Sequence, residues 1–446
     1  MRRDGTRLES PWYLCDLCTI TGREFYGRKT VTTDMSPRPD RLEILRQRNE
    51  RLTRVGPGTP MGAYLRRFWH PIATSAELKA IDLDVIPVKL LGERLALFRM
   101  DSGELGLISE RCPHRGAALS YGMVEEDGIR CPYHAWKFDK TGRCVDQPSE
   151  AEGSKLKERI RVNAYQATEM GGLIWAYLGP APVPLLPRWE YLVREDYKQD
   201  IGISEMPCNW LQVAENTMDP LHVEYLHMMY TNHVRKRKGL PLIPLKRHAK
   251  IDFEVFEYGI IKKRLWEGDP EDSVEWTVGH PQLFPGTALV TYQHGWNQFQ
   301  IRVPRDDANT TLYWLNCRPL AAGEPPQAEV LAWSNPWADE TGRYMPEQLN
   351  AQDMMVMLSQ GEITDHTKEN LISGDKGVAL YRHTLLEQID RVERGEDPLG
   401  VIRDPAKNTP WMDLPVEREL SFSFGDVQAS ARYDYSGAAL EDESVT

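Results

Sequence analysis

Long apolar runs are missing from this sequence of 446 residues, and so is an excess of positive charge. No stretch approaches the ~18 consecutive apolar residues that a membrane-spanning helix requires. The Arg2-Arg3 pair has no apolar segment behind it, so we expect no secretory signal peptide. The formal net charge of −12 argues against nucleic acid or an anionic membrane as the main partner.

Cysteine is also scarce, with seven residues in no spacing typical of a disulfide framework. This usage fits a reducing compartment, and we expect a cytoplasmic protein. The Gly-x-Gly-x-x-Gly fingerprint of dinucleotide-binding domains follows none of the predicted strands. If the chain carries out redox chemistry, we therefore expect a separate protein to deliver the electrons.

Two short motifs, Cys112-Pro-His114 and Cys131-Pro-Tyr-His134, are separated by 16 residues. Two cysteines and two histidines are the ligand set of a Rieske [2Fe–2S] centre, in which two thiolates hold one iron and two imidazoles hold the other. A proline in each motif restricts φ, which suits a tight loop. The alternative is a structural zinc site, which takes the same residue types. Zinc fingers usually pair like residues, whereas each motif here holds one of each, so we favour the iron–sulfur centre.

A Rieske centre passes on electrons and therefore needs an acceptor, and the segment from Asp219 to His227 offers one. His222 and His227 with a later carboxylate would make the facial triad that holds Fe(II) and leaves positions open for O₂. On a straight α-helix, two residues five apart point ~140° away from each other. Asp219-Pro220, however, has the form of an N-cap followed by proline at the first helical position, so a new and not necessarily regular helix begins there. Two ordinary helix histidines remain the simpler alternative.

Pattern changes along the chain predict an α+β fold with two main domains. Short strand-like runs broken by turn residues occupy 68–182, and both Cys–His motifs fall on loops between them. Closely spaced prolines then indicate a stiff linker. Alternating strands follow, with helices predicted at 208–218, 221–229, 346–358 and 378–394. We expect a leader at 1–34, disordered or preceding a true start at Met35, and a helical segment at 35–67 packed on the catalytic domain. An antiparallel β Rieske domain at 68–182 and a catalytic domain at 183–446, with an antiparallel sheet flanked by helices, complete the prediction.

These motifs, together with Asn209-Trp-Leu-Gln-Val-Ala-Glu-Asn216, resemble the Rieske non-haem iron oxygenases that hydroxylate aromatic rings. Within that family the chain is most similar to the oxygenase (alpha) component of the phthalate 4,5-dioxygenase type. The resemblance spans about residues 40–410. Ala308-Asn309 departs from the pattern, because members of this subgroup often carry histidine there. The two metal motifs are specific for the superfamily, whereas the subgroup rests on weaker similarities.

The resemblance implies a role for each motif residue. It makes Cys112, His114, Cys131 and His134 the ligands of the [2Fe–2S] cluster, and His222, His227 and Asp353 those of a mononuclear Fe(II). Asp353 lies on an apolar face of a predicted helix, where a carboxylate is costly unless it is paired or metal-bound, and Asp365 and Glu362 are the alternatives. Asp219, as a catalytic residue, would bridge a Rieske histidine of one subunit to an iron-ligating histidine of the next, or it would simply cap a helix. Asn216 would line the iron pocket, or be an amide at a helix end.

The family's reaction then gives the expected function. A terminal oxygenase component uses O₂ and electrons from an NADH-dependent reductase, with flavin and a plant-type [2Fe–2S] cluster, to hydroxylate a small carboxylated aromatic substrate. The alternatives are a monooxygenase that removes O- or N-methyl groups, and an electron-transfer protein without mononuclear iron. The resemblance also implies a homotrimer or a stacked hexamer. Candidate cations for a substrate carboxylate are Arg264, Arg302 and the basic run His233–Lys238, which could equally be a solvated loop or a docking face for an acidic reductase.

Overall fold

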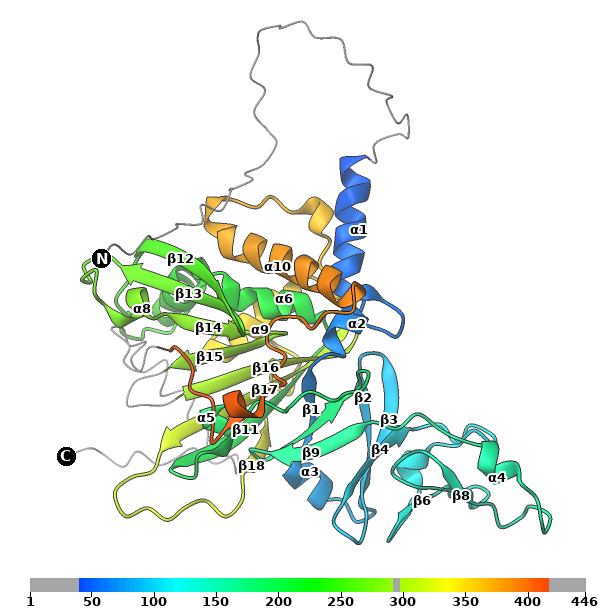
Figure 1. Ribbon diagram of the computed structural model, residues 1–446. Coiled ribbons are helices and arrows are strands. Elements are labelled where there is room, and N and C mark those ends of the chain that lie inside the picture. The colour runs from blue at the N-terminus through cyan, green and yellow to red at the C-terminus, as the bar shows by residue number, and fades with distance from the viewer. Residues whose placement is uncertain (1–39, 292–296, 417–446) are drawn as a thin grey trace, which may run out of the picture. The chain divides into compact units, whose positions relative to one another are not determined.

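The computed structural model describes residues 40–291 and 297–416. The α+β class predicted from the sequence is confirmed, because small antiparallel sheets precede one large sheet with helices packed on it (Figure 1). The predicted leader, residues 1–34, lies outside the described residues. None of the helices in the described ranges combines the length and the apolarity that a membrane crossing would need.

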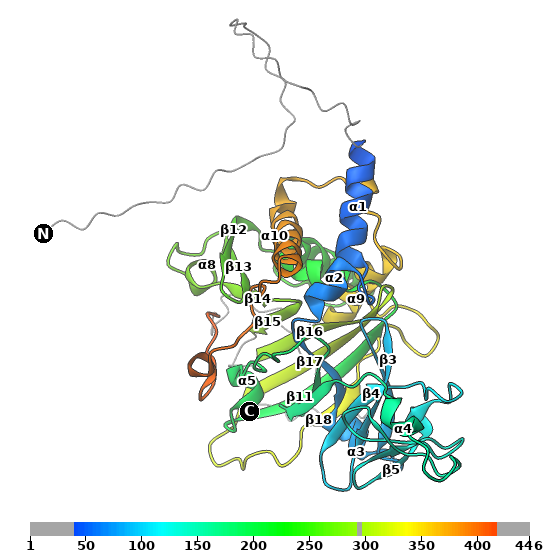
Figure 2. The ribbon, with the colours of Figure 1, turned by 45° about the vertical axis from the view of Figure 1, so that its right-hand side comes forward.

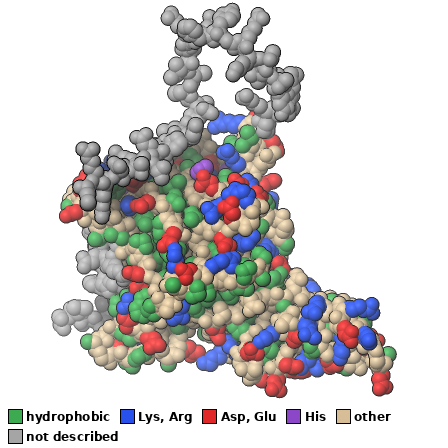
Figure 3. All heavy atoms as spheres, viewed as in Figure 1, with side chains coloured by type: hydrophobic (Ala, Val, Ile, Leu, Met, Phe, Trp, Pro, Cys, Tyr) green, Lys and Arg blue, Asp and Glu red, His purple; other side chains and the backbone are tan. Residues whose placement is uncertain are grey.

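Two helices open the described chain, α1 (Arg41–Thr53) and α2 (Pro60–Leu65). Both contact the long helix α10 (Lys376–Glu393), which lies beside them in Figures 1 and 2. An ion pair of 2.6 Å between Arg51 of α1 and Asp390 of α10 links two of these helices. Such pairs agree with Figure 3, where acidic and basic side chains are interspersed over the visible face.

Ten short strands form three antiparallel sheets in the first half of the described chain. The strand orders are β1-β10-β9, β2-β3-β4 and β5-β6-β7-β8. The strands are β1 Trp69–Thr74, β2 Val85–Leu90, β3 Glu93–Arg99, β4 Leu105–Ser109, β5 Met123–Glu125, β6 Gly128–Arg130, β7 Lys137–Phe138, β8 Cys144–Asp146, β9 Gln166–Met170 and β10 Leu173–Tyr177, with the short helices α3 Ser75–Lys79, η1 Leu119–Tyr121 and α4 Leu156–Arg159 between them. A small buried core that contains Phe98, Ile129 and Phe138 also includes Cys112 and Cys131. The two motif cysteines are therefore fixed in the interior of this part of the chain.

Eight strands build the large sheet in the order β12-β13-β14-β15-β16-β17-β11-β18. They are β11 Tyr197–Met206, β12 His248–Phe256, β13 Gly259–Trp266, β14 His280–Leu283, β15 Thr287–Thr291, β16 Asn297–Asp306, β17 Asn309–Pro319 and β18 Leu331–Ser334. Neighbours are antiparallel except β11 and β18, so the predicted antiparallel sheet is right for all but one edge pair. Along β16, Gln298, Gln300 and Arg302 alternate with Phe299 and Ile301, which belong to the main core. Because strand side chains alternate between faces, the polar residues share the opposite face.

The helices that carry the predicted iron ligands pack on this sheet, since α6 contacts β16 and α9 contacts both α6 and the π-helix η3. The elements are α5 Glu190–Val193, α6 Trp210–Glu215, η2 Asn216–Met218, η3 Val223–Tyr230, α7 Thr231–Arg237, α8 Val274–Thr277, α9 Leu349–Ser359, η5 His366–Lys368, η6 Ser373–Asp375 and η7 Pro405–Asn408. Helices predicted at 208–218, 346–358 and 378–394 are confirmed within a few residues. The helix predicted at 221–229 is present, but it is largely of the π type.

The small sheets and the large sheet share one buried core. The turn between β2 and β3 adds backbone hydrogen bonds, because Leu91 N–H donates to the carbonyl of Pro304 at 3.0 Å. The proline-rich segment is also packed, since the indole N–H of Trp69 donates to the carbonyl of Pro184 at 2.9 Å. The segment that the sequence predicts to be a linker is thus held against β1.

Candidate metal centres and substrate cavity

The two Cys–His motifs fold into the same turn. The cysteine N–H donates to the carbonyl five residues later, at 2.9 Å for Cys112 and 2.8 Å for Cys131. The residue four positions after the cysteine donates back to the cysteine carbonyl and has a positive φ, +77° at Gly116 and +58° at Ala135. Glycine adopts this conformation at little cost, whereas alanine rarely does. Gly116 therefore indicates the first turn in the sequence, whereas Ala135 gives no such indication of the second turn.

The side chains of these turns meet in two pairs. Cys112 and Cys131 are each 2% exposed and form no disulfide. Burial, with a further contribution from the neighbouring Cys131 thiol, raises the pKa of Cys112 to about 11. His114 and His134 lie nearer the surface with ring centroids 4.5 Å apart, and Trp136 stacks on His114 at 4.6 Å. The motifs thus present two buried sulfurs and two outer imidazoles.

This arrangement fits a two-iron cluster better than a single zinc ion. A tetrahedral zinc site brings its ligand atoms to within ~4 Å of one another. Among the described residues, one group of three possible metal ligands has all its ligand atoms within 4.8 Å of one another, and that group contains none of these four side chains. Two thiols and two imidazoles in separate pairs match the ligand set in which each pair holds its own iron.

The two histidines of the second predicted metal site belong to the π-helix η3, Val223–Tyr230, with His227 inside it and His222 as its N-cap. A π-helix closes its turns with i→i+5 bonds, so residues five apart lie on one face. His222 and His227 therefore face the same way, with ring centroids 5.0 Å apart, unlike the ~140° separation of a regular α-helix. Asp219 caps the start of this segment, where its Oδ1 accepts from the amide of Leu221 at 2.9 Å. The capping role that the sequence allowed for Asp219 is therefore present.

His222, His227 and Asp353 form the one group of possible metal ligands in the described ranges whose ligand atoms all lie within 4.8 Å. His222 Nε2 is 3.7 Å and His227 Nε2 is 3.2 Å from Asp353 Oδ1. The Nδ1 atom of each imidazole makes a hydrogen bond, in His222 with the backbone carbonyl of Asp219 and in His227 with Oε1 of Gln352 at 3.0 Å. Such outer bonds fix the tautomer, and both Nε2 lone pairs are left for a metal.

Asp353 of α9, rather than either alternative carboxylate, comes together with the histidines. Its Oδ1 also accepts from Nδ2 of Asn216 at 3.2 Å. Asp365 instead caps η5, through the amide of Thr367 at 3.0 Å, and Glu362 lies in an exposed stretch. The geometry therefore favours Asp353 as the third ligand.

Burial and mutual contacts shift the pKa values of all three residues of this site. Burial lowers the pKa of His222 to about 3. Burial also acts to lower the pKa of His227, but Asp353 outweighs it and that pKa is raised. Burial acts to raise the pKa of Asp353, and the two imidazoles outweigh it, so that this pKa is lowered. Asp353 is thus favoured as the carboxylate and His222 as the neutral imidazole, the forms that bind a metal, whereas the adjacent carboxylate favours protonation of His227.

A cavity of about 110 Å³ opens beside this triad. Its polar wall comes from the large sheet: Lys262 and Arg264 of β13, His280 and Gln282 of β14, and Gln300 of β16. Val223, Leu289 and Leu349 contribute apolar surface. Two cations and a metal triad in one cavity favour a ligand that is partly apolar and negatively charged.

The structure separates the predicted substrate cations. Arg264 lines the cavity beside the triad, whereas Arg302 lines a different cavity. The Arg302 guanidinium donates to the carbonyl and to the side-chain oxygen of Gln300, at 2.6 and 2.7 Å. No residue of 233–238 is among those that line the iron cavity. Lys262 was not identified from the sequence. Strand alternation places Lys262 on the same face of β13 as Arg264, but nothing in the sequence shows which face of β13 lies toward the π-helix η3.

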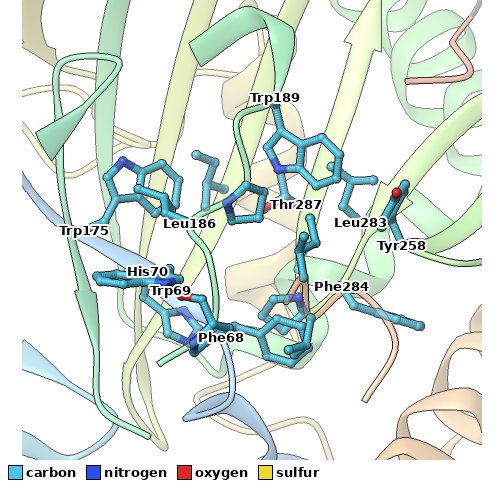
Figure 4. A pocket seen from close by; sticks show the side chains of 18 of the residues that line it. Phe68, Trp69, His70, Trp175, Leu186, Trp189, Tyr258, Leu283, Phe284 and Thr287 are labelled. Atoms are coloured by element: carbon cyan, nitrogen blue, oxygen red, sulfur yellow. Dashed lines mark hydrogen bonds between the residues drawn. The ribbon is translucent and has the colours of Figure 1, made fainter. Parts of the chain in front are cut away.

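The other cavity, of about 50 Å³, shares no lining residue with the first. Aromatic side chains surround it, among them Phe68, Trp175 and Trp189 (Figure 4). His70 on β1 belongs to the same wall, is 2% exposed, and its ring bonds the carbonyl of Leu65 at 2.8 Å. Burial lowers the pKa of His70 to about 4. This cavity lies where β1 and β10 meet the large sheet, and we interpret it as imperfect packing between the two.

Fold and site together define a class of protein, one with an iron–sulfur β domain and a metal triad of two histidines and one carboxylate. Residues 68–166 match the Rieske [2Fe-2S] domain family. The chain is 41% identical over 367 residues to the 5,5'-dehydrodivanillate O-demethylase oxygenase subunit of Sphingobium sp., covering 81% of this chain and 84% of that one. It is 28% identical over 397 residues to the phthalate 4,5-dioxygenase oxygenase subunit of Pseudomonas putida, covering 79% and 88%. Among solved structures, NdmA of Pseudomonas putida CBB5 has the same fold, with a TM-score of 0.56 and 21% identity over 80% of this chain and 98% of that chain.

The chain therefore belongs to the Rieske non-haem iron oxygenases, as its motifs predicted. It is an oxygenase subunit of an oxidoreductase that incorporates O₂, with a Rieske [2Fe–2S] cluster and mononuclear iron as cofactors. The similarity to a phthalate 4,5-dioxygenase agrees with the predicted type. The roles of individual site residues stay predictions.

Proposed function

We propose that this oxygenase subunit oxidises an aromatic carboxylate beside an iron held by His222, His227 and Asp353. The observation that carries the proposal is the convergence of these three side chains in a cavity whose sheet wall supplies Lys262 and Arg264. When bound, the cluster supplies single electrons and the mononuclear iron activates O₂. Every other part of the proposal concerns what the side chains of this chain bind and orient.

We assign the cluster to Cys112, His114, Cys131 and His134, and the iron to the triad. The carbonyl of Asp219 and the amide of Gln352 hold the outer nitrogens of the two triad imidazoles. Asn216 holds the Asp353 oxygen that faces both imidazoles. These contacts keep the three ligands aimed at one point before iron arrives.

The charge of the cavity supports an anionic substrate. Fe(II), with one ligating carboxylate and neutral imidazoles, leaves one positive charge in the site. Arg264 pairs with Glu275, 3.3 Å away, and the Lys262 ammonium donates to the carbonyl of Thr217 at 2.8 Å. Two cationic side chains in the wall of a cavity beside a divalent metal favour a substrate that carries a carboxylate.

The partner and the assembly belong to the same proposal. We propose an NADH-dependent reductase with flavin and a plant-type cluster as electron donor, and a cytoplasmic homotrimer or stacked hexamer. Tyr133, which is 54% exposed and packs against the His134 ring, offers apolar surface for an electron-transfer contact. Asp219 would then stand between His134 of a neighbouring subunit and His222.

A second candidate is O-demethylation of a methoxylated aromatic acid. The observation that favours it is the 41% identity to an enzyme named as an O-demethylase. In that reaction O₂, two electrons and two protons convert a methoxy group to a hydroxyl with release of formaldehyde and water. In ring dihydroxylation the same inputs place both oxygen atoms on the ring.

A product screen with a surrogate reductase tests both candidates. Aromatic acids with and without methoxy groups are supplied, and formaldehyde and cis-diols are measured. Lys262→Met should raise the KM for an aromatic acid at least ~10-fold and leave the KM of the matching aromatic amide little changed. Lys263→Met is the matched control, because Lys263 lies on the other face of β13 and pairs with Glu254 at 2.7 Å. Turnover of amides but of no aromatic acid would overturn the proposed substrate class.

A further inference from the structure

The facing of His222 and His227 depends on an uncommon backbone form. A π-helix is rare and usually occurs as a single turn within an α-helix. Here it spans Val223–Tyr230, between α6–η2 and α7. If the segment relaxed to an α-helix, the two imidazoles would diverge by ~140°. Some contact outside the segment must therefore favour the π form.

Glu224 makes such a contact from inside the π-helix. Its side chain is 9% exposed, and its Oε1 accepts two hydrogen bonds from one residue, His248. The backbone N–H of His248 donates at 2.8 Å and the ring Nδ1 at 2.6 Å. One carboxylate oxygen is thus tied to both the backbone and the side chain at the first residue of β12.

His248 is itself fixed in place. Its side chain is 1% exposed and its ring stacks on Trp266 of β13, with centroids 3.9 Å apart and planes 24° apart. His248 and Trp266 are also register partners in the sheet. The indole N–H of Trp266 donates to Oε2 of Glu275 at 2.7 Å, which fixes the far edge of the stack. The hydrogen bonds to Glu224 therefore come from a rigid part of the sheet.

We propose that Glu224 and His248 form a clamp that holds the π-helix in register, so that His222 and His227 face Asp353. Both are positioning residues, because neither belongs to the group of ligand atoms. The inference rests on the proposed assignment of His222, His227 and Asp353 to iron. Gln352 orients the His227 ring alone, whereas the clamp sets the backbone between the two histidines.

The test measures iron binding and backbone protection rather than turnover. Full-length holoprotein is depleted of mononuclear iron and titrated anaerobically with Fe(II), with the Rieske absorbance as internal standard. Glu224→Ala and His248→Ala should each weaken Fe(II) binding by roughly 10- to 100-fold with an unchanged Rieske spectrum. Glu224→Gln keeps an acceptor oxygen and should recover most of the affinity. Amide exchange over 221–231 should rise in the alanine variants and not in Glu224→Gln.

Two controls separate the clamp from its surroundings. Tyr225→Phe changes the neighbouring residue, which is 53% exposed, and should leave Fe(II) binding unchanged. The double variant Glu224→Ala/His248→Ala should bind Fe(II) no more weakly than the worse single variant, because the two residues act through one contact. Wild-type affinity in both alanine variants would overturn the clamp. If His222→Ala also kept its iron, the ligand assignment itself would fail, so the two failures are distinguishable.

Discussion

His222 and His227 approach the same oxygen of Asp353, with Nε2 to Oδ1 distances of 3.7 and 3.2 Å. The two histidines are separated by one turn of a π-helix, and the aspartate comes from α9, far along the chain. A carboxylate and two imidazoles held this close together, with at most 15% of each side chain exposed, are costly without a cation between them. The arrangement is therefore best understood as a site formed for metal.

Removal of any one ligand should empty the mononuclear site alone. We expect His222→Ala, His227→Ala and Asp353→Ala to lose mononuclear iron and turnover, because two protein ligands hold iron weakly. The Rieske spectrum should persist, since its ligands lie in a separate core. Iron analysis should fall from about three to about two per chain, as the [2Fe–2S] cluster remains. Asp365→Asn is the control and should retain iron, and loss of iron there instead of in Asp353→Ala would exchange their roles.

Removal of a cluster ligand should have the opposite effect, with loss of the [2Fe–2S] cluster and retention of the mononuclear iron. Cys112→Ser or His134→Ala removes one of only two protein ligands of one iron, so the reducible visible chromophore should disappear. Mononuclear iron binding should persist in both variants. Cys144→Ser is a matched control, because this buried thiol belongs to the same core but to neither motif. A preserved chromophore in Cys112→Ser would contradict the Rieske assignment.

Sequence and structure agree best where chemistry fixes residue types. The short Cys–His motifs predicted the Rieske domain, which the family match confirms, and alternating patterns predicted an antiparallel sheet in the second half of the chain. The π-helix was not predicted, because a five-residue spacing of histidines does not distinguish it from an irregular α-helix, and its contacts, such as those of Glu224 with His248, come from a distant strand. Lys262 was missed for a similar reason, since its face is decided by tertiary packing. The parallel pairing of β18 with β11 likewise depends on contacts far apart in the chain.

His70 should make stability depend on pH. Burial lowers its pKa from 6.5 to about 4, so the unfolded chain binds the proton first. Its contribution is complete above pH 6.5 and is lost as the pH falls toward 4, by about 3 kcal/mol in total. His70→Gln keeps a donor for the carbonyl of Leu65 and should flatten this part of the profile. Denaturant midpoints of both proteins at pH 7, 5.5 and 4.5 measure the difference, and parallel profiles would show that His70 does not titrate in this range.

Electrons should cross a subunit boundary to reach the iron. His134 lies at the partly exposed edge of the Cys–His turns, and Asp219 begins the segment that carries His222. In a closed ring of head-to-tail contacts, each cluster would meet the iron segment of the next subunit. Asp219→Asn should keep both metals and the assembly, yet uncouple cluster oxidation from product formation. Rapid-mixing absorbance of the reduced cluster, followed with product analysis, measures this coupling.

Mixed assemblies give the decisive comparison. Cys112→Ser lacks the cluster and His222→Ala lacks the mononuclear iron, so each parent should be inactive. If electrons pass between subunits, oligomers that contain both variants should regain activity, because some cluster-bearing subunits then face iron-bearing neighbours. Differently tagged variants, purified through both tags, ensure that only mixed oligomers are assayed, and the double variant in one chain serves as the inactive control. Verified mixed oligomers without activity would restrict electron transfer to a single chain, and in that case Asp219 would act only as the cap of the iron-bearing segment.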